Sequence, residues 1–119
     1  MKQVKVYYLG SCDTCQKILK EWNLGADAVL QDIKTEKITE AQLDEMAALA
    51  GGYEPLFSRR ALKYKALGLA QLKLEEADYR RYILEEYTFL KRPVAVLGNE
   101  IFVGNANAVV EAAKAALSK

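Results

Sequence analysis

The residues best suited to chemistry in this chain are Cys12 and Cys15, the only two cysteines among its 119 residues. They follow an apolar run at residues 4–9 and precede a helical pattern that begins near residue 14. A helix N-terminus favours a thiolate over a thiol, and the thiolate is the nucleophile. The spacing of three places both sulfurs on one helix face, within reach of a disulfide. The pair is therefore predicted to be a redox site.

Other uses of such a pair fit this chain less well. A structural zinc site needs about four ligands, and the chain offers two cysteines and no histidine, so we expect no metal within one chain. Haem attachment needs a histidine after the second cysteine, where Gln16 stands. The alternatives that remain are a zinc site shared between subunits and two small residues packed at a helix start. The lack of histidine also excludes Ser-His-Asp and Cys-His catalysis.

The length, composition and net charge are those of an ordinary globular protein. A length of 119 residues predicts one domain, 1–119, and a net charge of +1 argues against nucleic-acid or membrane partners. No apolar stretch has the length of a membrane span, and the N-terminus lacks the apolar region of a signal peptide. We therefore expect a cytoplasmic protein, in a compartment that keeps thiols reduced.

Hydrophobic patterns and turn signals predict a definite order of elements. Strands are expected at 3–9 and 28–33, and helices at 14–24 and from Thr39 to Gly51-Gly52. Residues 55–89 are predicted to be mostly helical, including a helix from about 56 to 67. A hairpin of 93–97 and 100–103 turns at Gly98-Asn99, and Asn105 is expected to cap a helix at 106–117. The fold class is α/β, with a mixed four-stranded sheet (βαβ, a helical insert at about 38–89, then ββα) in a thioredoxin-like three-layer fold.

Asp13 lies between the two cysteines and has two opposing effects. Its carboxylate stabilises the helix N-terminus, but it also disfavours a thiolate on Cys12. Nearby cations decide which of the two effects determines the Cys12 pKa. The arginines of the chain are therefore important for the site.

Four stretches in order resemble the arsenate reductase / Spx-like family of thioredoxin-fold proteins (ArsC-like), and they span nearly the whole chain. They are YLGSCDTCQK at 8–17, LFSRRALKY at 56–64, LKRPVAV at 90–96 and VG at 103–104. The second is similar to the family's helix with the pattern L-x-x-x-R-x-x-x-Y/F, and the third to its Arg-Pro followed by a strand.

The resemblance implies roles for individual residues. Cys12 matches the family's reactive cysteine, and Arg60 and Arg92 match arginines associated with oxyanion binding near the thiol. Pro93 matches the proline beside the active site, which is usually cis in thioredoxin folds. Two guanidinium groups near Cys12 would offset Asp13 and hold an anion in a bidentate manner.

Two features depart from the reductases of the family. Those that act on arsenate carry a further arginine near the end of the hairpin, where residues 101–104 here contain no basic residue. Glutathione-linked members typically need one cysteine, whereas this chain has a C-x-x-C. The pair looks more like the family's redox-sensing regulators, which bind RNA polymerase. Gly52 falls where those regulators have a contact glycine, although a helix cap also explains it.

Three functions follow. The first is a thiol oxidoreductase resembling arsenate reductase, with Cys12 as the nucleophile for an oxyanion or thiol substrate. Cys15 or glutathione/glutaredoxin would resolve the intermediate, and glutathione/glutaredoxin or thioredoxin would donate electrons, with no bound cofactor. The second is an Spx-like regulator that binds RNA polymerase through a Cys12–Cys15 disulfide switch. The third is a protein-binding fold without thiol chemistry. We favour the first, because the resemblance and the two arginines agree.

Overall fold

One mixed sheet of four strands organises the part of the chain that bears the cysteines. The structure is a computed structural model that describes residues 3–118. Strand β1 (Val4–Tyr8) pairs in parallel with β2 (Val29–Asp32) and antiparallel with β3 (Val94–Leu97). Strand β4 (Glu100–Val103) pairs antiparallel with β3, which gives the order β2-β1-β3-β4. The predicted α/β class and mixed four-stranded sheet are confirmed.

The contacts within the chain divide it into two units, and each is described by itself. The sheet unit comprises Met1–Lys37 and Arg92–Lys119, and the helical unit comprises Ile38–Lys91. The helical unit coincides closely with the insert predicted at about 38–89. A single domain over 1–119 stays a prediction.

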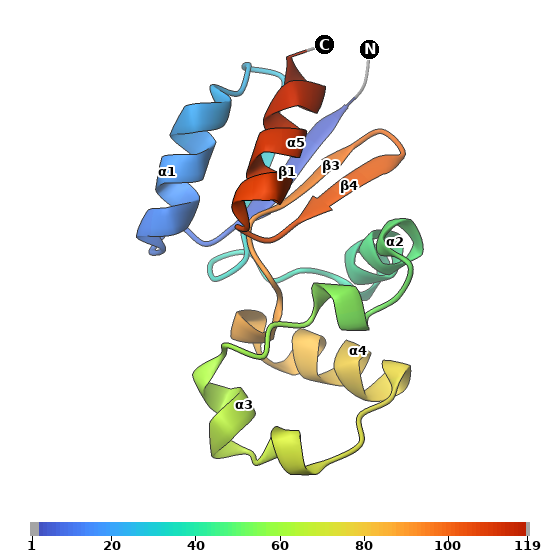
Figure 1. Cartoon of the computed structure of the whole chain (residues 1–119). Coiled ribbons are helices and arrows are strands. Elements are labelled where there is room, and N and C mark those ends of the chain that lie inside the picture. Colours follow the sequence, from blue (N-terminus) through green and yellow to red (C-terminus); the bar gives the residue numbers. More distant parts are fainter. Residues whose placement is uncertain (1–2, 119) are drawn as a thin grey trace. The chain divides into compact units, whose positions relative to one another are not determined.

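Two helices pack on one face of the sheet and build the core of the sheet unit. They are α1 (Asp13–Trp22) and α5 (Asn107–Leu117), which run side by side in the same direction (Figure 1). Their buried side chains join those of β1 and β3 in one apolar cluster, made of Val6, Ile18, Trp22, Ala95, Leu97, Val110 and Ala113. The indole Nε1–H of Trp22 donates a hydrogen bond of 3.1 Å to the carbonyl oxygen of Val110. This bond satisfies the one polar atom of a buried ring and links the two helices.

The ends of these helices differ slightly from prediction. Helix α1 ends at Trp22 because Asn23 adopts a left-handed conformation, and its N–H closes the last turn on the carbonyl oxygens of Leu19 and Lys20. The expected Asn105 cap is wrong, because Ala106 is the N-cap residue of α5 and makes no capping hydrogen bond with its side chain.

The helical unit contains three α-helices and three short 3-10 turns in its described residues. The helices are α2 (Glu40–Ala50), α3 (Leu62–Ala66) and α4 (Glu76–Glu85), and the turns are η1 (Glu54–Leu56), η2 (Leu69–Gln71) and η3 (Tyr87–Phe89). Thr39 caps α2 with the predicted capping box, in which its hydroxyl accepts the N–H of Gln42 and the Gln42 side chain accepts the N–H of Thr39.

The prediction of one helix from about 56 to 67 is wrong. Phe57 instead forms an antiparallel bridge with Leu90, and hydrogen bonds join Ser58 N–H to Phe89 O and Lys91 N–H to Leu56 O. The Phe57 ring is fully buried and stacks on Phe89 with the ring centroids 5.0 Å apart. This pairing between distant segments overrides the local helical pattern, so α3 begins only at Leu62.

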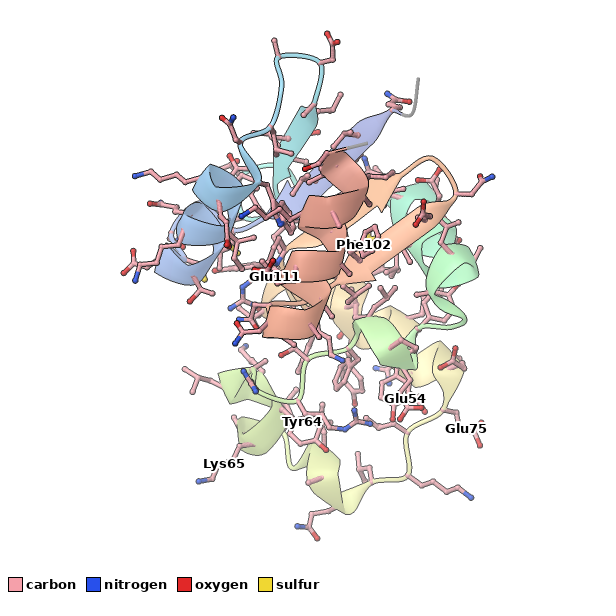
Figure 2. All side chains as sticks on the ribbon, turned by 45° about the horizontal axis from the view of Figure 1, so that its top comes forward. Glu54, Tyr64, Lys65, Glu75, Phe102 and Glu111 are labelled. Atoms are coloured by element: carbon pink, nitrogen blue, oxygen red, sulfur yellow. The ribbon has the colours of Figure 1, made fainter. Side chains whose placement is uncertain are left out.

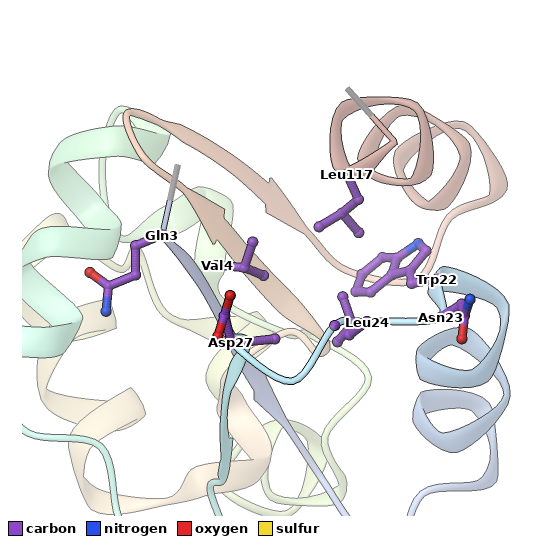
Figure 3. Close-up of a pocket in the computed structure, with 9 residues that line it drawn as sticks. Gln3, Val4, Trp22, Asn23, Leu24, Asp27 and Leu117 are labelled. Atoms are coloured by element: carbon purple, nitrogen blue, oxygen red, sulfur yellow. The ribbon is translucent and has the colours of Figure 1, made fainter. Parts of the chain in front are cut away.

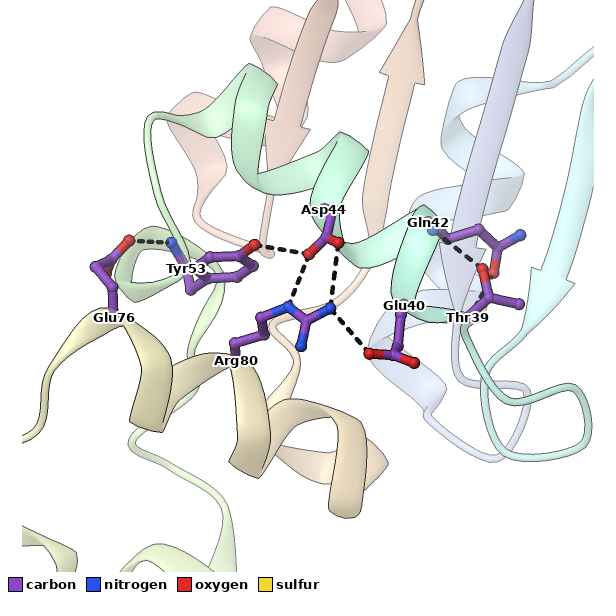
Figure 4. A network of polar contacts seen from close by, with 7 residues as sticks. All are labelled: Thr39, Glu40, Gln42, Asp44, Tyr53, Glu76 and Arg80. Carbon is purple, nitrogen blue, oxygen red and sulfur yellow. Dashed lines mark hydrogen bonds and ion pairs between the residues drawn. The ribbon is translucent and has the colours of Figure 1, made fainter.

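Polar contacts join α2 to α4 within the helical unit (Figure 4). The guanidinium of Arg80 contacts the carboxylates of Asp44 at 2.9 Å and Glu40 at 3.0 Å. The Tyr53 hydroxyl donates a hydrogen bond of 2.6 Å to the same Asp44 carboxylate. Asp44 therefore bridges two helices and the loop that follows α2. No helix among the described residues has both the length and the apolar character needed to cross a membrane.

Candidate functional site

Cys12 lies in the short loop that leads from β1 into α1. Its N–H donates a hydrogen bond of 3.0 Å to the carbonyl oxygen of Leu9, and its own carbonyl accepts the N–H of Gln16 at 3.1 Å. The residue is the N-cap of α1, with extended dihedral angles. Its side chain is partly exposed, so a reagent in solution can reach the sulfur.

Cys15 lies in the first turn of the same helix and is fully buried. Both cysteines are free thiols in this structure. The predicted juxtaposition holds, because the Cys15 thiol forms a hydrogen bond with the sulfur of Cys12. The sulfur of Cys12 is therefore accessible to solvent, and the sulfur of Cys15 is buried next to it.

The two thiols have shifted pKa values in opposite directions. Burial raises the pKa of Cys12, but the backbone N–H and thiol of Cys15, the N–H of Thr14 and the charge of Arg92 outweigh it and leave this pKa below its ordinary value. Burial raises the pKa of Cys15 to about 11, and the neighbouring Cys12 adds to that shift. The effect expected from Asp13 is not among these largest influences on Cys12. The site thus favours a thiolate on Cys12 and a protonated Cys15.

Two residues that the sequence did not single out hold the loop in front of Cys12. The Gln16 side-chain amide donates a hydrogen bond to the carbonyl oxygen of Gly10. Gly10 itself lies against Asp32 at the end of β2, and a Cβ at position 10 would collide with the Asp32 carboxylate. The other oxygen of that carboxylate accepts the N–H of Lys34 at 3.0 Å. A side chain at position 10 would therefore have to displace the Asp32 carboxylate, and this contact between distant residues has no local sequence signal.

Arg92 and Pro93 lie at the end of the sheet where β1 ends and the loop to Cys12 begins. Val94 is paired with Tyr7 of β1 on one side and Val103 of β4 on the other, so Pro93 is next to the C-terminal end of β1. Pro93 is buried, and the Arg92–Pro93 peptide bond is cis. The charge of Arg92 acts on both Cys12 and Cys15. The structure thus brings together four predicted residues, Cys12, Cys15, Arg92 and Pro93.

Arg60 belongs to the helical unit and does not lie on a helix, which corrects the placement implied by the resemblance. It occupies the turn before α3, and its N–H contacts the Ser58 hydroxyl at 3.3 Å. The reason is the bridge of Phe57, which keeps the preceding backbone extended. Its side chain is exposed and makes no hydrogen bond or ion pair within the described part of its own unit. The neighbouring Arg59 is different, since it contacts Glu54 at 2.9 Å and the Tyr79 hydroxyl at 3.0 Å.

A model of the ArsC family matches residues 7–113, which is most of the chain. The chain belongs to the ArsC family. A search of curated proteins gave no match. Family membership supports assignment as a thiol-dependent oxidoreductase and agrees with the resemblance inferred from the four sequence stretches.

Several solved structures are similar to this chain. A structure described as the YFFB (PA3664) protein is 28% identical, with a TM-score of 0.78, and the match covers 97% of this chain and 99% of that one. Arsenate reductase from Vibrio cholerae has a TM-score of 0.77 at 18% identity, over 92% of this chain and 97% of that chain. An ArsC family related protein from Bacteroides fragilis has a TM-score of 0.75 at 22% identity, over 92% and 96%. The last two show a shared fold.

This ArsC-family chain has no arginine at the end of its hairpin. Strand β4 ends at Val103, and Gly104, Asn105 and Ala106 lead into α5. Asn105 is exposed there. Within residues 3–118 no cluster of three or more histidine, cysteine, aspartate or glutamate side chains could hold a metal ion.

Gly52 has a structural explanation within the helical unit. Its φ is +145°, and a Cβ at this position would lie 2.6 Å from Oε1 of Glu76. The Glu76 carboxylate accepts the N–H groups of Tyr53 at 2.8 Å and Glu54 at 3.1 Å. A side chain at position 52 would displace the group that caps the next turn, so the fold alone accounts for this glycine.

Proposed function

We propose that the chain is an arsenate reductase-like enzyme that uses Cys12 as its nucleophile and Cys15 as the resolving thiol. The observation that carries the proposal is the opposite direction of the two pKa shifts at adjacent sulfurs. A partly exposed thiol with a lowered pKa suits attack on a substrate, and a buried protonated thiol suits a later step. The names of several structural neighbours point to the same reaction class.

In the first step, the Cys12 thiolate attacks the arsenic of arsenate. A sulfur–arsenic bond forms, and one oxygen of the oxyanion leaves as water after protonation. In the second step, the Cys15 thiolate attacks Sγ of Cys12, so that a disulfide forms and the sulfur–arsenic bond breaks. The electron pair of that bond stays on arsenic, which leaves as arsenite. An external thiol donor, which we propose to be glutathione with glutaredoxin or thioredoxin, then reduces the disulfide.

The order of these steps follows from the interaction between the two sulfurs. The charged form of Cys12 and its hydrogen bond with Cys15 both contribute to the raised pKa of Cys15. Once Cys12 is bonded to arsenic, its negative charge is gone and this contribution disappears. Cys15 therefore becomes easier to deprotonate after the first step, when its thiolate is needed. Glutathione or glutaredoxin could resolve the adduct in place of Cys15 by the same exchange chemistry.

Two arginines are proposed to bind the oxyanion. Arg92 already acts electrostatically on Cys12, and its charge would attract an anion to that sulfur. Arg60 has an exposed guanidinium without a partner in its own unit, so no intramolecular contact there must break before it binds an anion. Planar guanidinium groups bind tetrahedral oxyanions by paired hydrogen bonds. Pro93 is proposed to line the site beside them.

The deciding experiment is the rate of thiol alkylation against pH, with and without arsenate. Cys12→Ser and Cys15→Ser variants identify which thiol reacts. We expect Cys12 to react with a pKa below that of a cysteine in an unstructured peptide and to be protected by arsenate. Turnover is then measured with glutathione and glutaredoxin or with thioredoxin as donor. If Cys12 has an ordinary pKa and arsenate does not slow its alkylation, the proposal is wrong.

Matched variants test the anion site. Arg60→Gln should weaken arsenate protection, and Arg60→Lys should restore only part of it because the fork of donors is lost. Lys65→Gln is the control, since Lys65 is an exposed cation that projects from α3 of the same unit (Figure 2). Equal effects of Arg60→Gln and Lys65→Gln would show that Arg60 contributes only net charge.

The same variants separate the enzyme from the regulatory alternative. A disulfide switch predicts a reversible Cys12–Cys15 disulfide and binding to a protein such as RNA polymerase that depends on oxidation, without arsenate turnover. The enzyme predicts turnover that is lost in Cys12→Ser. We place either activity in the cytoplasm, where thiols are kept reduced.

A further inference from the structure

An open cavity of about 410 Å³ lies at the end of the sheet unit opposite to Cys12. The start of β1, the last residues of α1 and α5, and the loop between α1 and β2 enclose it (Figure 3). Because α1 begins beside Cys12 and ends at this cavity, the length of that helix, about 15 Å for ten residues, separates the two places. None of the lining residues within 3–118 takes part in the proposed thiol chemistry.

The walls of the cavity are mainly apolar. Figure 3 shows Val4 on one side and Trp22, Leu24 and Leu117 on the other. The Trp22 ring is held in place by its hydrogen bond to the Val110 carbonyl, so this wall is preformed. The volume and the apolar lining are typical of sites that bind small molecules.

The charged and polar groups around the cavity favour a cation. Among the described residues that line it, Asp27 is the only ionisable one, and its carboxylate lies at the rim on the side of Val4 (Figure 3). Both α1 and α5 end here, and the C-terminal ends of helices carry partial negative charge. Each helix has one lysine in its last turn, Lys20 in α1 and Lys114 in α5, but neither lines the cavity, and Lys114 is paired with Glu21 at 3.6 Å.

The same two helices make the ends of the sheet unit electrostatically different. Their N-termini lie at the end that bears Cys12, where positive partial charge favours an anion. Their C-termini lie at the cavity, where the Asp27 carboxylate adds a full negative charge. A ligand of the cavity should therefore have the opposite charge to the proposed oxyanion substrate.

We propose that this cavity binds a small organic cation that consists of an apolar body and an ammonium group. The apolar body packs against Trp22, Leu24 and Leu117, and the ammonium group lies beside Asp27 and the helix ends. The proposal is independent of the function assigned to Cys12.

The test uses the intrinsic fluorescence of Trp22, which is the only tryptophan in the chain. The full chain is titrated with three compounds of one shape and different charge, 4-phenylbutylammonium, 4-phenylbutanol and 4-phenylbutyrate. We expect the ammonium compound to change the Trp22 emission and to bind at least tenfold more tightly than the carboxylate. The alcohol should fall between them. Equilibrium dialysis of the same compounds confirms binding without relying on fluorescence.

Variants of two acidic residues locate the cation. Asp27→Asn should reduce the affinity for the ammonium compound to that for the alcohol and leave the alcohol unchanged. Glu111→Gln removes the same charge from an exposed residue of α5 that does not line the cavity, and it should have no effect (Figure 2). Circular dichroism establishes that both variants are folded before they are titrated.

Three results would overturn the proposal. The first is that none of the compounds binds by either method, and the second is that the carboxylate binds as tightly as the ammonium compound. The third concerns Lys2, which precedes the lining residue Gln3 in the sequence. If Lys2→Gln raises the affinity for the ammonium compound tenfold or more, the Lys2 amine competes with the compound, and the ligand of the cavity is this amine of the chain itself. An unchanged affinity in this variant supports an external ligand.

Discussion

The N–H of Gly104 donates a hydrogen bond of 2.9 Å to the carbonyl oxygen of Pro93. This bond ties the end of β4 to the residue that precedes β3, at the end of the sheet from which Cys12 emerges. Position 105 is therefore the residue directly after Gly104, which lies at the edge of the thiol site. The arginine that the resemblance implies near the end of the hairpin has no counterpart in residues 101–104, and the next residue, Asn105, is exposed.

The first prediction is a gain of anion binding in Asn105→Arg. A guanidinium at this position should strengthen the protection of Cys12 by arsenate several-fold, because it adds a cation at the end of the sheet unit that bears the thiol. Asn99→Arg is the matched control, since Asn99 lies in the turn at the other end of the same hairpin. The measurement is the arsenate concentration that halves the rate of Cys12 alkylation. Equal improvement in both variants would show an effect of net charge only.

The second prediction concerns the hydrogen bond between the two sulfurs. Cys15→Ala removes the thiol donor and should raise the Cys12 pKa, whereas Cys15→Ser keeps a hydroxyl donor and should raise it less. The backbone N–H of residue 15 is present in both variants. At a pH below the Cys12 pKa, the thiolate fraction falls by about tenfold for each unit by which that pKa rises, and the alkylation rate falls with it. The check is a pH profile of alkylation for each variant, and indistinguishable profiles for alanine and serine would contradict the role of the side chain.

The third prediction concerns the close approach of Gly10 and Asp32. Gly10→Ala should destabilise the fold by about 1–3 kcal/mol, because the new methyl group meets the Asp32 carboxylate. Gly10→Ala combined with Asp32→Ala should lose less than the sum of the two single changes, since the collision is then removed. Gly25→Ala is the control, as nothing lies within 4 Å of a Cβ at position 25. Urea denaturation gives the free energies of unfolding, and additive effects would refute the contact.

Much of the sheet unit could be predicted from local sequence patterns. The apolar run before Cys12 forms β1, the Gly98-Asn99 turn forms the hairpin, and the spacing of Ile18 and Trp22 gives the buried face of α1. Each of these signals lies within a few neighbouring residues. The C-x-x-C pair was predictable for the same reason, because its position at a helix start follows from the adjacent patterns.

The features that could not be predicted depend on residues far apart in the sequence. The extended backbone at Phe57 results from pairing with Leu90, and no local pattern near Arg60 indicates it. Gly10 meets Asp32 only because β1 and β2 are neighbours in the sheet. The direction of the Cys12 pKa shift likewise needed the positions of Arg92 and Cys15, since in the sequence alone the helix N-terminus favoured a thiolate and the charge of Asp13 opposed it.

The fourth prediction separates two glycines that follow α2. Both have positive φ, +90° at Gly51 and +145° at Gly52, but only a Cβ at position 52 meets a neighbour, the Glu76 carboxylate. Gly51→Ala should cost about 1 kcal/mol through backbone strain alone. Gly52→Ala should cost more, because it also displaces the acceptor of the Tyr53 and Glu54 N–H groups. Thermal unfolding of the two variants tests the order, and a smaller loss for Gly52→Ala would contradict it.

The fifth prediction concerns acid stability of the helical unit. A hydrogen bond from Arg80, followed by one from Tyr53, lowers the pKa of Asp44 below its ordinary value. A carboxylate with a lowered pKa in the folded state contributes stability above its unfolded pKa, and this contribution is lost as the pH falls through the folded value. Arg80→Gln and Tyr53→Phe should each weaken this dependence, with the larger effect for Arg80→Gln. Urea midpoints measured between pH 3 and pH 7 provide the test. Since Asp44 would then titrate nearer its unfolded pKa, the variants should lose less stability than the wild type over the lower part of that range, and parallel curves for all three proteins would show that Asp44 does not couple the two helices.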